Sequence, residues 1–372
     1  MSQTIPVNIP KFHGNELEHL SRCLKEGWIS SEGPFVAEFE QRFAETIGRR
    51  HAVAVSSGTA ALSVAVAALR LEPGAEVIVP ALTIISCLEA IVRNRLKPVL
   101  VDSDPLTWNM DPADVARKIT SRTRAIMIVH LYGLPADLDP ILALAQKHGL
   151  KVIEDAAEML GQTYREKNCG SFGDLSTFSF YPNKLLTTGE GGMVVTGDDE
   201  LAERTRRFRN LCFEPPRRFV HRELGWNFRL TSLQAAFGLA QLEYLSANVR
   251  RKREIGARYE QGLAKLAAFT RPPVRTAYAE NIDWVYGVVL SPAVSFDAER
   301  AMKFLQDHGV GTRPFFWPMH EQPVFRKEKL FSGERHPVAE NLARRGLYLP
   351  SGLGTTDEQI DAVISACQKL FS

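Results

Sequence analysis

Three short segments combine residue types that could carry out chemistry, and the first is the turn Ser57-Gly58-Thr59. It follows the apolar run at 51–55 and precedes a helical pattern, which predicts a strand-turn-helix unit. Free N–H groups and hydroxyls at such a helix start suit a single phosphate group, although serine and threonine are also ordinary helix caps. The turn lacks the Gly-x-Gly-x-x-Gly spacing of a dinucleotide fold, which argues against a nicotinamide oxidoreductase.

The second segment is the acidic pair Glu154-Asp155, which closes the predicted strand at 151–155. A carboxylate at the end of a central parallel strand points into the crevice where ligands bind. Because burial of a carboxylate without a cationic partner is costly, a positive group should lie opposite. An aspartate that caps a helix is the alternative interpretation.

The third segment places Lys184 in a loop between two predicted strands. Pro182 stiffens the turn, and the glycines at 189, 191 and 192 let the backbone fold tightly around it. Partial burial lowers the pKa of a lysine, as a lysine that forms a Schiff base requires. A surface lysine beside a hairpin is the alternative.

The phosphate turn, the carboxylate and the lysine share one edge of a mainly parallel sheet, and together they match the three anchors of pyridoxal 5′-phosphate (PLP). The lysine would bind the cofactor covalently, the carboxylate would keep the pyridine nitrogen protonated, and the turn would bind the 5′-phosphate. We therefore predict PLP as the cofactor and expect no metal.

Longer spans resemble the DegT/DnrJ/EryC1/StrS family of sugar aminotransferases, in the same order and at similar spacing. These spans are SSGTAAL, VIEDAAE, DLSTFSFYPNKLLTTGEGGMVVT and GWNFRLTSLQAA. The resemblance implies a fold-type I PLP enzyme that acts on nucleotide-linked keto sugars, as a homodimer with shared active sites. The segments HLYGLPADLDPI, EPPRRF and TRPFFWPMH, with the pair Trp284 and Tyr286, are most similar to members that aminate C4 of GDP-4-keto-6-deoxymannose.

The resemblance also implies roles for single residues. Lys184 would be the Schiff-base lysine and would move the proton taken from the amino donor, L-glutamate. Asp155 would pair with the ring nitrogen, and Glu158 would lie near the phenolic oxygen. Asn227 would reach the phosphate from the neighbouring subunit, with Arg229 orienting its loop. The other phosphate ligands would be Gly58, Thr59 and Ser179, and Ser57 is a further candidate.

One position departs from the family pattern. After Thr83 the family usually has an aromatic residue that stacks on the cofactor ring, whereas this chain has Ile84. An aliphatic side chain packs on a ring face without the specific stacking geometry. A changed grip on the ring, or a changed ring tilt, is therefore expected.

The charge of a sugar diphosphate predicts basic side chains around the entrance of the site. Guanidinium groups fit phosphate oxygens well, although a solvated surface explains adjacent arginines equally well. A histidine at a strand end is as often a structural residue. The candidates for substrate contact are His130, Tyr132, Arg217, Arg218, Arg229, Arg313 and His320.

Other activities stay open at this point. The sugar could be dTDP- or UDP-linked, with its carbonyl at C3 or C4, because resemblance of fold is weak evidence for a substrate. A PLP-dependent sugar dehydratase would carry histidine at position 184, so Lys184 favours transamination. A non-catalytic PLP-binding regulator is a further alternative, against which the complete pair of Asp155 and Lys184 argues.

The elements that must position these residues follow from periodicity. Apolar runs separated by helical patterns predict an α/β fold with a mostly parallel seven-stranded sheet, covered by helices on both faces. A helical stretch at 232–266, as two helices or one bent helix, leads to a smaller α+β unit. We place the domains at 1–245, with an N-terminal helical segment, and 246–372. The predicted strands lie at 51–55, 76–80, 98–102, 125–130, 151–155, 176–180, 193–196 and 284–290.

Composition excludes several classes of protein. With 45 Lys and Arg against 43 Asp and Glu, the net charge of +2 gives no support for a nucleic-acid binder. No apolar stretch reaches the roughly 18 residues needed to span a bilayer, and the N-terminus lacks a secretory signal pattern. The five cysteines are odd in number and scattered, which is typical of a reducing compartment. We expect a cytoplasmic enzyme without nucleic-acid or membrane partners.

Overall fold

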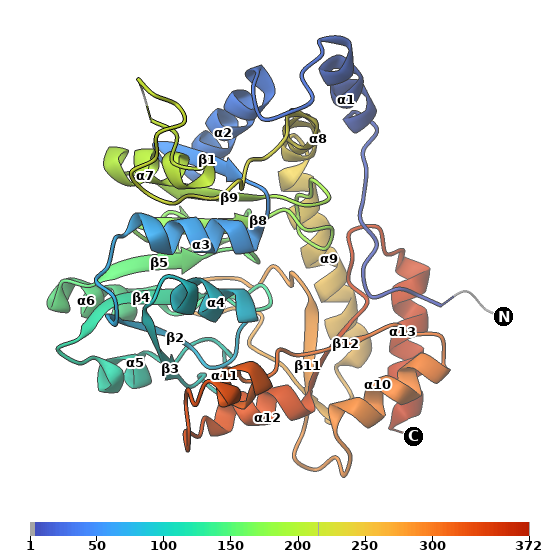
Figure 1. Cartoon of the computed structure of the whole chain (residues 1–372). Coiled ribbons are helices and arrows are strands. Elements are labelled where there is room, and N and C mark those ends of the chain that lie inside the picture. Colours follow the sequence, from blue (N-terminus) through green and yellow to red (C-terminus); the bar gives the residue numbers. More distant parts are fainter. Residues whose placement is uncertain (1–3, 215, 372) are drawn as a thin grey trace.

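The computed structural model describes residues 4–214 and 216–371, and a seven-stranded sheet lies at the centre of its N-terminal two-thirds (Figure 1). The strand order is β1-β9-β8-β5-β4-β2-β3, and β9 runs antiparallel to both of its neighbours while the other pairs are parallel. The predicted α/β fold with a mostly parallel sheet is thereby confirmed. The strands are β1 (His51–Val55), β2 (Glu76–Pro80), β3 (Lys97–Val101), β4 (Thr123–Val129), β5 (Lys151–Asp155), β8 (Leu175–Ser179) and β9 (Gly192–Thr196).

Helices cover both faces of this sheet, as the nearly continuous apolar strands require. In β8, Phe178 packs against Phe43 of α2 (Pro34–Ile47), whereas Ser179 lies beside Gly58 at the start of α3 (Gly58–Ala68). Because successive side chains of a strand point to opposite faces, α2 and α3 lie on opposite faces. The other helices of this region are α4 (Ile85–Arg93), α5 (Pro112–Lys118), α6 (Leu138–His148) and α7 (Asp199–Arg209).

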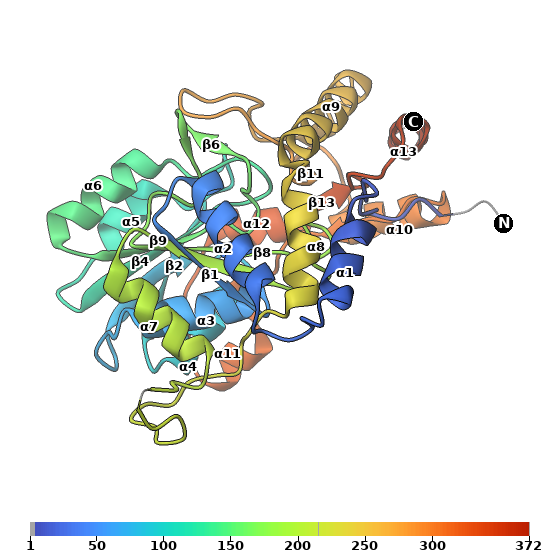
Figure 2. The ribbon, with the colours of Figure 1, turned by 90° about the horizontal axis from the view of Figure 1, so that it is seen from above.

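Two successive helices connect the large sheet to the C-terminal part. The stretch predicted as two helices or one bent helix forms α8 (Ser232–Leu242) and α9 (Leu245–Leu263), which follow each other almost end to end in Figures 1 and 2. Thr231 and Gln234 form a reciprocal capping box at the start of α8. The N-terminal helix α1 (Glu16–Lys25) packs against α8.

The C-terminal residues build a second sheet with its own hydrophobic core. Its order is β10-β11-β13-β12, with antiparallel pairing throughout, which confirms the predicted smaller α+β unit. On α9, Val249 packs in the larger core and Ile255 in the smaller one, and the division at residues 245 and 246 stays a prediction. The elements are β10 (Phe269–Thr270), β11 (Tyr286–Leu290), α10 (Ala298–Asp307), β12 (Arg313–Pro314), α11 (Pro323–Lys327), α12 (Pro337–Arg345), β13 (Gly346–Leu349) and α13 (Asp357–Leu370).

Two small features complete the architecture of the described residues. A hairpin of β6 (Thr163–Tyr164) and β7 (Lys167–Asn168) follows β5, and a 3-10 turn, Met319–Glu321, precedes α11. Among the described residues, no helix is both long enough and apolar enough to cross a bilayer.

Candidate active site

A cavity of about 350 Å³ lies at the carboxyl ends of the central parallel strands. β1, β4, β5 and β8 all end at this edge of the sheet, so the turns that follow them converge here. The cavity collects residues that are far apart in the sequence and that were singled out for chemistry. The predicted residues that line it are Ser57, Gly58, Thr59, Ile84, His130, Tyr132, Asp155, Glu158, Ser179 and Lys184.

The turn after β1 offers an anion site at the start of α3. Ser57 is the N-cap, and its hydroxyl accepts a hydrogen bond from the N–H of Ala60 (3.0 Å). The first N–H groups of a helix have no acceptor within the helix, so those of Gly58 and Thr59 are available to a phosphate. The Thr59 hydroxyl also contacts that of Ser86, in the first turn of α4, at 2.8 Å.

Asp155, the last residue of β5, is a buried carboxylate without an ion-pair partner among the described residues. It accepts hydrogen bonds from the N–H of Ala157 (3.1 Å) and the thiol of Cys87 (3.3 Å). Burial raises the pKa of Asp155 because the charged form loses its hydration. A nearby cation would favour the ionised form of Asp155, and a protonated ring nitrogen would be such a cation.

The amine of Lys184 lies between an acid and an aromatic ring. Its Nζ is 4.0 Å from Glu158 Oε1 and 3.8 Å from the centre of the Trp284 ring. Burial lowers the pKa of Lys184, while the carboxylates of Glu158 and Asp155 oppose that shift. Burial likewise raises the pKa of Glu158 to about 7, although Lys184 and a hydrogen bond from the N–H of Tyr132 (2.6 Å) act against it.

These groups fit PLP by their chemistry. The free N–H groups at the start of α3 could bind the phosphate, and the buried carboxylate of Asp155 could pair with the pyridinium. The amine of Lys184, with its lowered pKa, could attack the aldehyde carbon of the cofactor. The turn also sits tightly between two strands, because a Cβ added to Gly58 would lie 2.8 Å from the Cβ of Ser179. The predicted ring-facing residue Ile84 is half-exposed at the N-cap of α4 and lines the same cavity.

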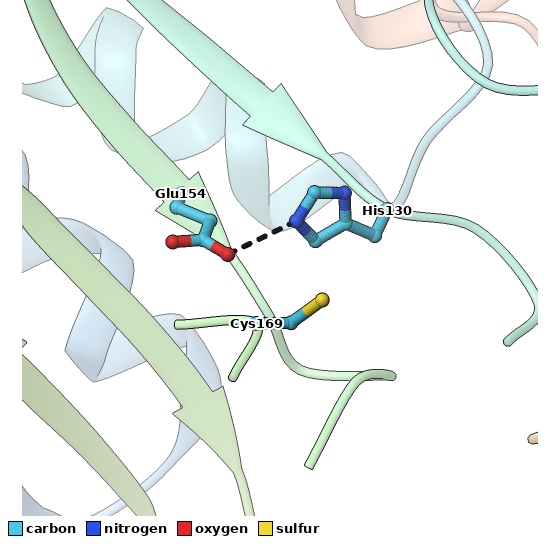
Figure 3. A group of neighbouring side chains, drawn as sticks. All are labelled: His130, Glu154 and Cys169. Carbon is cyan, nitrogen blue, oxygen red and sulfur yellow. Dashed lines mark hydrogen bonds and ion pairs between the residues drawn. The ribbon is translucent and has the colours of Figure 1, made fainter. Parts of the chain in front are cut away.

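His130 lies at the cavity wall, but both of its ring nitrogens are occupied, one of them by Glu154 as Figure 3 shows. Nε2 lies 3.1 Å from Glu154 Oε1, and Nδ1 accepts from the N–H of Ala136 at 3.1 Å. Glu154 also accepts from the N–H of Phe172 and the hydroxyl of Ser176. The ring therefore has no nitrogen free for a sugar hydroxyl. It links the end of β4 to β5, and its partner Glu154 contacts the loop after the β6–β7 hairpin.

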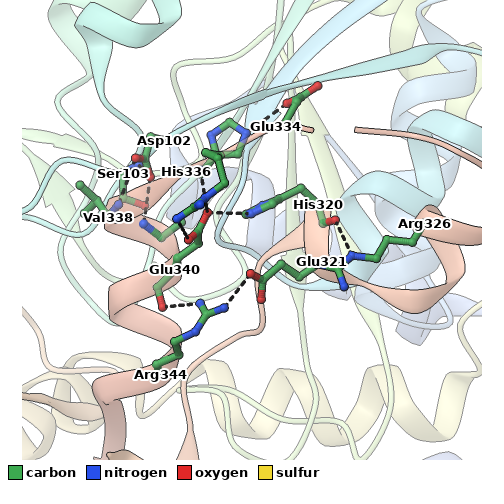
Figure 4. Close-up of polar contacts among 12 residues, drawn as sticks. Asp102, Ser103, His320, Glu321, Arg326, Glu334, His336, Val338, Glu340 and Arg344 are labelled. Carbon is green, nitrogen blue, oxygen red and sulfur yellow. Dashed lines mark hydrogen bonds and ion pairs between the residues drawn. The ribbon is translucent and has the colours of Figure 1, made fainter. Parts of the chain in front are cut away.

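His320, a predicted sugar contact, does not line this cavity. It is buried on the 3-10 turn, where its Nε2 lies 3.2 Å from Glu340 Oε1 of α12 and its ring lies 4.9 Å from that of His336 (Figure 4). Figure 4 also shows the carboxylate of Asp102, after β3, which accepts hydrogen bonds from the N–H groups at the start of α12. His320 thus belongs to a polar cluster that joins the 3-10 turn to α12, and the expected sugar contact finds no support here.

The predicted arginines are placed outside the cavity. Arg313 lines a neighbouring cavity of about 540 Å³ that shares Tyr181, Asn183, Trp284 and Tyr348 with the first. Arg217 and Arg218 are exposed in the segment between α7 and α8. The roles of Arg217, Arg218 and Arg313 in substrate binding stay predictions.

Asn227 and Arg229 are also absent from the lining of the cavity in their own chain. The backbone of Asn227 pairs with that of Asn210, and the guanidinium of Arg229 donates to Asn210 Oδ1 at 2.9 Å. Arg229 further pairs through its backbone with Val55 at the end of β1. The contact with Asn210 agrees with a role of Arg229 in orienting this loop.

Several lining residues were not among the predicted site residues. Cys87 is not part of the lining, but it donates to Asp155 and was also not predicted. It carried a signal, since it follows Thr83 by four residues at helical spacing, and the two side chains are 3.3 Å apart. Trp284 is part of the family resemblance, but no pattern near it in the sequence predicts its contact with Lys184. Further lining residues include Ser86, Thr177, Tyr181, Asn183, Glu190, Phe316 and Tyr348.

Comparison with known proteins places relatives of this chain among aminotransferases. The sequence model of the DegT/DnrJ/EryC1/StrS aminotransferase family matches residues 10–368. The chain is 43% identical to the GDP-perosamine synthase of Caulobacter vibrioides, over 99% of this chain and 98% of that one. It is 40% identical to the GDP-perosamine synthase of Escherichia coli O157:H7, over 99% of both chains. The crystal structure of DesV from S. venezuelae, 34% identical, superimposes with a TM-score of 0.91 over 99% of both chains.

Proposed function

Because the chain belongs to the DegT/DnrJ/EryC1/StrS aminotransferase family, we propose that it transfers an amino group from L-glutamate to a nucleotide-linked 4-keto-6-deoxy sugar. It is a PLP-dependent enzyme, as members of this family are. The observation that carries the proposal is the convergence of Lys184, Asp155 and the Ser57-Gly58-Thr59 turn on one cavity. These are the groups that transamination with this cofactor requires.

The chain's own residues would divide the work as follows. PLP, when bound, supplies an electron sink for the bond broken at the donor Cα. Gly58, Thr59 and Ser179 would hold its phosphate, and Asp155 would hold the proton on its ring nitrogen. In the first half-reaction Lys184 would take the proton from the donor Cα and deliver it to the cofactor, and in the second it would deliver a proton to the sugar carbon. A single amine can do both because its pKa is lowered by burial, so that its neutral form is accessible.

Glu158 and Trp284 would hold the amine of Lys184 in place between these proton transfers. Closely packed walls would also exclude water, since Phe178, Tyr132 and Trp284 are buried side chains of the cavity lining. Exclusion of water strengthens the interaction of Lys184 with Glu158 and Asp155.

The proposed acceptor is GDP-4-keto-6-deoxy-D-mannose, and the product would be GDP-perosamine. Its support is the similarity to two proteins named GDP-perosamine synthase, over nearly the whole length of both chains. The net reaction balances: the amino group and hydrogen lost by glutamate appear on the sugar carbon. The sugar's carbonyl oxygen leaves as water, and the keto oxygen of 2-oxoglutarate comes from water.

The test is an assay of the purified protein with L-glutamate and GDP-, dTDP- or UDP-linked 4-keto-6-deoxy sugars. We expect release of 2-oxoglutarate and an amino sugar with the GDP-linked sugar, at a kcat/KM at least about tenfold above the other two. Lys184→Ala should abolish turnover. Equal rates with a dTDP- or UDP-linked sugar would overturn the choice of nucleotide, and full activity of Lys184→Ala would overturn the mechanism.

We also propose that the enzyme works as a homodimer in the cytoplasm. Support for the dimer is that Asn227, the implied phosphate ligand, does not line the cavity of its own chain. Support for the compartment is that all five cysteines are free and buried, as in proteins of reducing surroundings.

A further inference from the structure

The loop that carries Lys184 is held by side chains from three distant segments. The carbonyl of Pro182 accepts a hydrogen bond from Asn8 Nδ2 (3.2 Å), and that of Asn183 accepts one from Trp284 Nε1 (3.0 Å). The carbonyl of Leu185 accepts one from Asn248 Nδ2 on α9 (2.9 Å). Carbonyls on both sides of Lys184 are therefore fixed by donors outside the loop.

Trp284 is the donor that also touches the reactive group. Its ring centre lies 3.8 Å from Lys184 Nζ, while its indole N–H holds the carbonyl of the preceding residue, Asn183. One rigid side chain thus fixes the backbone beside Lys184 and the position of the amine. The face of an indole ring stabilises a cation, so the distance of the ring from Nζ influences the balance between the charged and neutral amine.

Lys252 of α9 in turn holds Trp284. Its side chain is buried, and its Nζ donates to the carbonyl of Trp284 (2.5 Å) and to that of Ser351. It forms no ion pair among the described residues, although the charge of Asp283 favours its protonated form. Burial lowers the pKa of Lys252 to about 7. Either protonation state of Nζ has N–H donors for both carbonyls.

We infer that Lys252 is a positioning residue for Lys184, acting through Trp284. This inference rests on the proposed function, and it names a residue outside the cavity of Lys184 that tunes the reactive amine. Loss of the Nζ donors frees the carbonyl of Trp284, and the indole ring then moves relative to Lys184. The charge balance of Lys184 shifts with it, without loss of any group that lines the cavity of Lys184.

The test compares Lys252→Met, which keeps the length of the side chain and removes its donors, with Lys303→Met on the exposed face of α10. The first readout is the pH dependence of the visible absorbance of the PLP-loaded protein. The second is the rate at which Lys184 of the cofactor-free protein captures added PLP, measured by quenching with borohydride and mass spectrometry of the peptide that contains Lys184.

For Lys252→Met we expect the midpoint of the absorbance change to shift by about half a pH unit or more, and capture at Lys184 to slow severalfold. Lys303→Met should match the wild type in both readouts. Lys252→Gln keeps two N–H donors on a shorter side chain and should recover part of the shift. Trp284→Phe keeps a ring but loses the indole N–H, and should shift the midpoint with Lys252 intact.

The outcomes separate the two proposals. If the wild type shows no visible cofactor band and no transamination, the proposed function is wrong. If the wild type is active but Lys252→Met keeps its midpoint and capture rate, only the positioning role is wrong. Should Lys252→Met fail to fold, Lys252→Gln and Trp284→Phe decide the matter by the same two readouts, and unchanged values in both would overturn the inference.

Discussion

At the scale of single residues, two buried carboxylates at this site differ in their partners. Asp155 has the N–H of Ala157 and the thiol of Cys87, and no cation at ion-pair distance among the described residues. Glu158 has Lys184 at 4.0 Å and the N–H of Tyr132. Asp155 is thus arranged for a cation that the cofactor would bring, whereas Glu158 is arranged for a cation that the chain itself supplies.

The burial of Glu158 predicts a dependence of stability on pH. The pKa of Glu158 is about 7, above its ordinary value of 4.5, so its contribution to stability is complete below pH 4.5 and is lost as the pH rises through 7. Glu158→Gln removes this titration. In the cofactor-free protein, the advantage of the wild type in unfolding temperature over Glu158→Gln should therefore fall by about a few degrees between pH 5 and pH 8.

Lys184 does not reverse this sign. Because the pKa of Lys184 is lowered in the folded protein, Lys184 reduces the free energy of unfolding as the pH falls. Without the Glu158 carboxylate that pKa is lower still. Glu158→Gln therefore again becomes more stable relative to the wild type as the pH rises. Glu299→Gln, an exposed change on α10, serves as the control and should show a constant difference. A constant difference for Glu158→Gln as well would mean that Glu158 does not titrate in this range.

At the scale of elements, the phosphate turn depends on how closely α3 approaches β8 and β9. A Cβ on Gly58 would lie 2.8 Å from the Cβ of Ser179 in β8. A Cβ on Gly192 in β9 would lie 2.5 Å from the carbonyl oxygen of Ser57. Two glycines therefore let the N-terminus of α3 sit against the ends of two strands, where its free N–H groups face the cavity.

Gly58→Ala tests this close approach. The added methyl group must push the start of α3 away from β8, and overpacking of this kind costs about 1–3 kcal/mol. We expect the affinity for PLP to fall at least about tenfold. This is measured by titrating the cofactor-free protein with PLP and following the visible absorbance of the bound form. The unfolding temperature should also fall. Gly197→Ala is the matched control, because its Cβ would meet nothing closer than the Arg49 side chain at 3.8 Å. Unchanged affinity in Gly58→Ala would mean that the turn does not bind the phosphate.

At the scale of the whole molecule, the sequence predicts features that depend on neighbouring residues better than contacts between residues far apart in the chain. The strands and the placement of Asp155 and Lys184 at one sheet edge follow from local patterns and from parallel topology. The contact of Trp284 with Lys184 joins residues about a hundred positions apart, and no local pattern encodes it. His320 lies in a matched motif, but a motif does not state which way a side chain points, and its ring turns toward α12.

The surface of the chain also bears on its assembly. Large apolar side chains are exposed on α1 and the segment after it, and others are exposed on the segment between α7 and α8 that precedes Asn227. Burial of such side chains against a second copy would be favourable. In a two-fold dimer the same surface of each copy contacts the other copy. Asn227 of each copy could then reach the phosphate turn of the other.

Mixed subunits decide whether the site is shared. Lys184→Ala and Asn227→Ala are each expected to have little activity alone. After the two are unfolded and refolded together in equal amounts, half of the dimers should pair one of each, and such a dimer has one site with both Lys184 and Asn227 intact. About one quarter of wild-type activity per site should therefore return. If each subunit used its own Asn227, no mixture could restore an intact site, and activity would stay at the level of the separate variants.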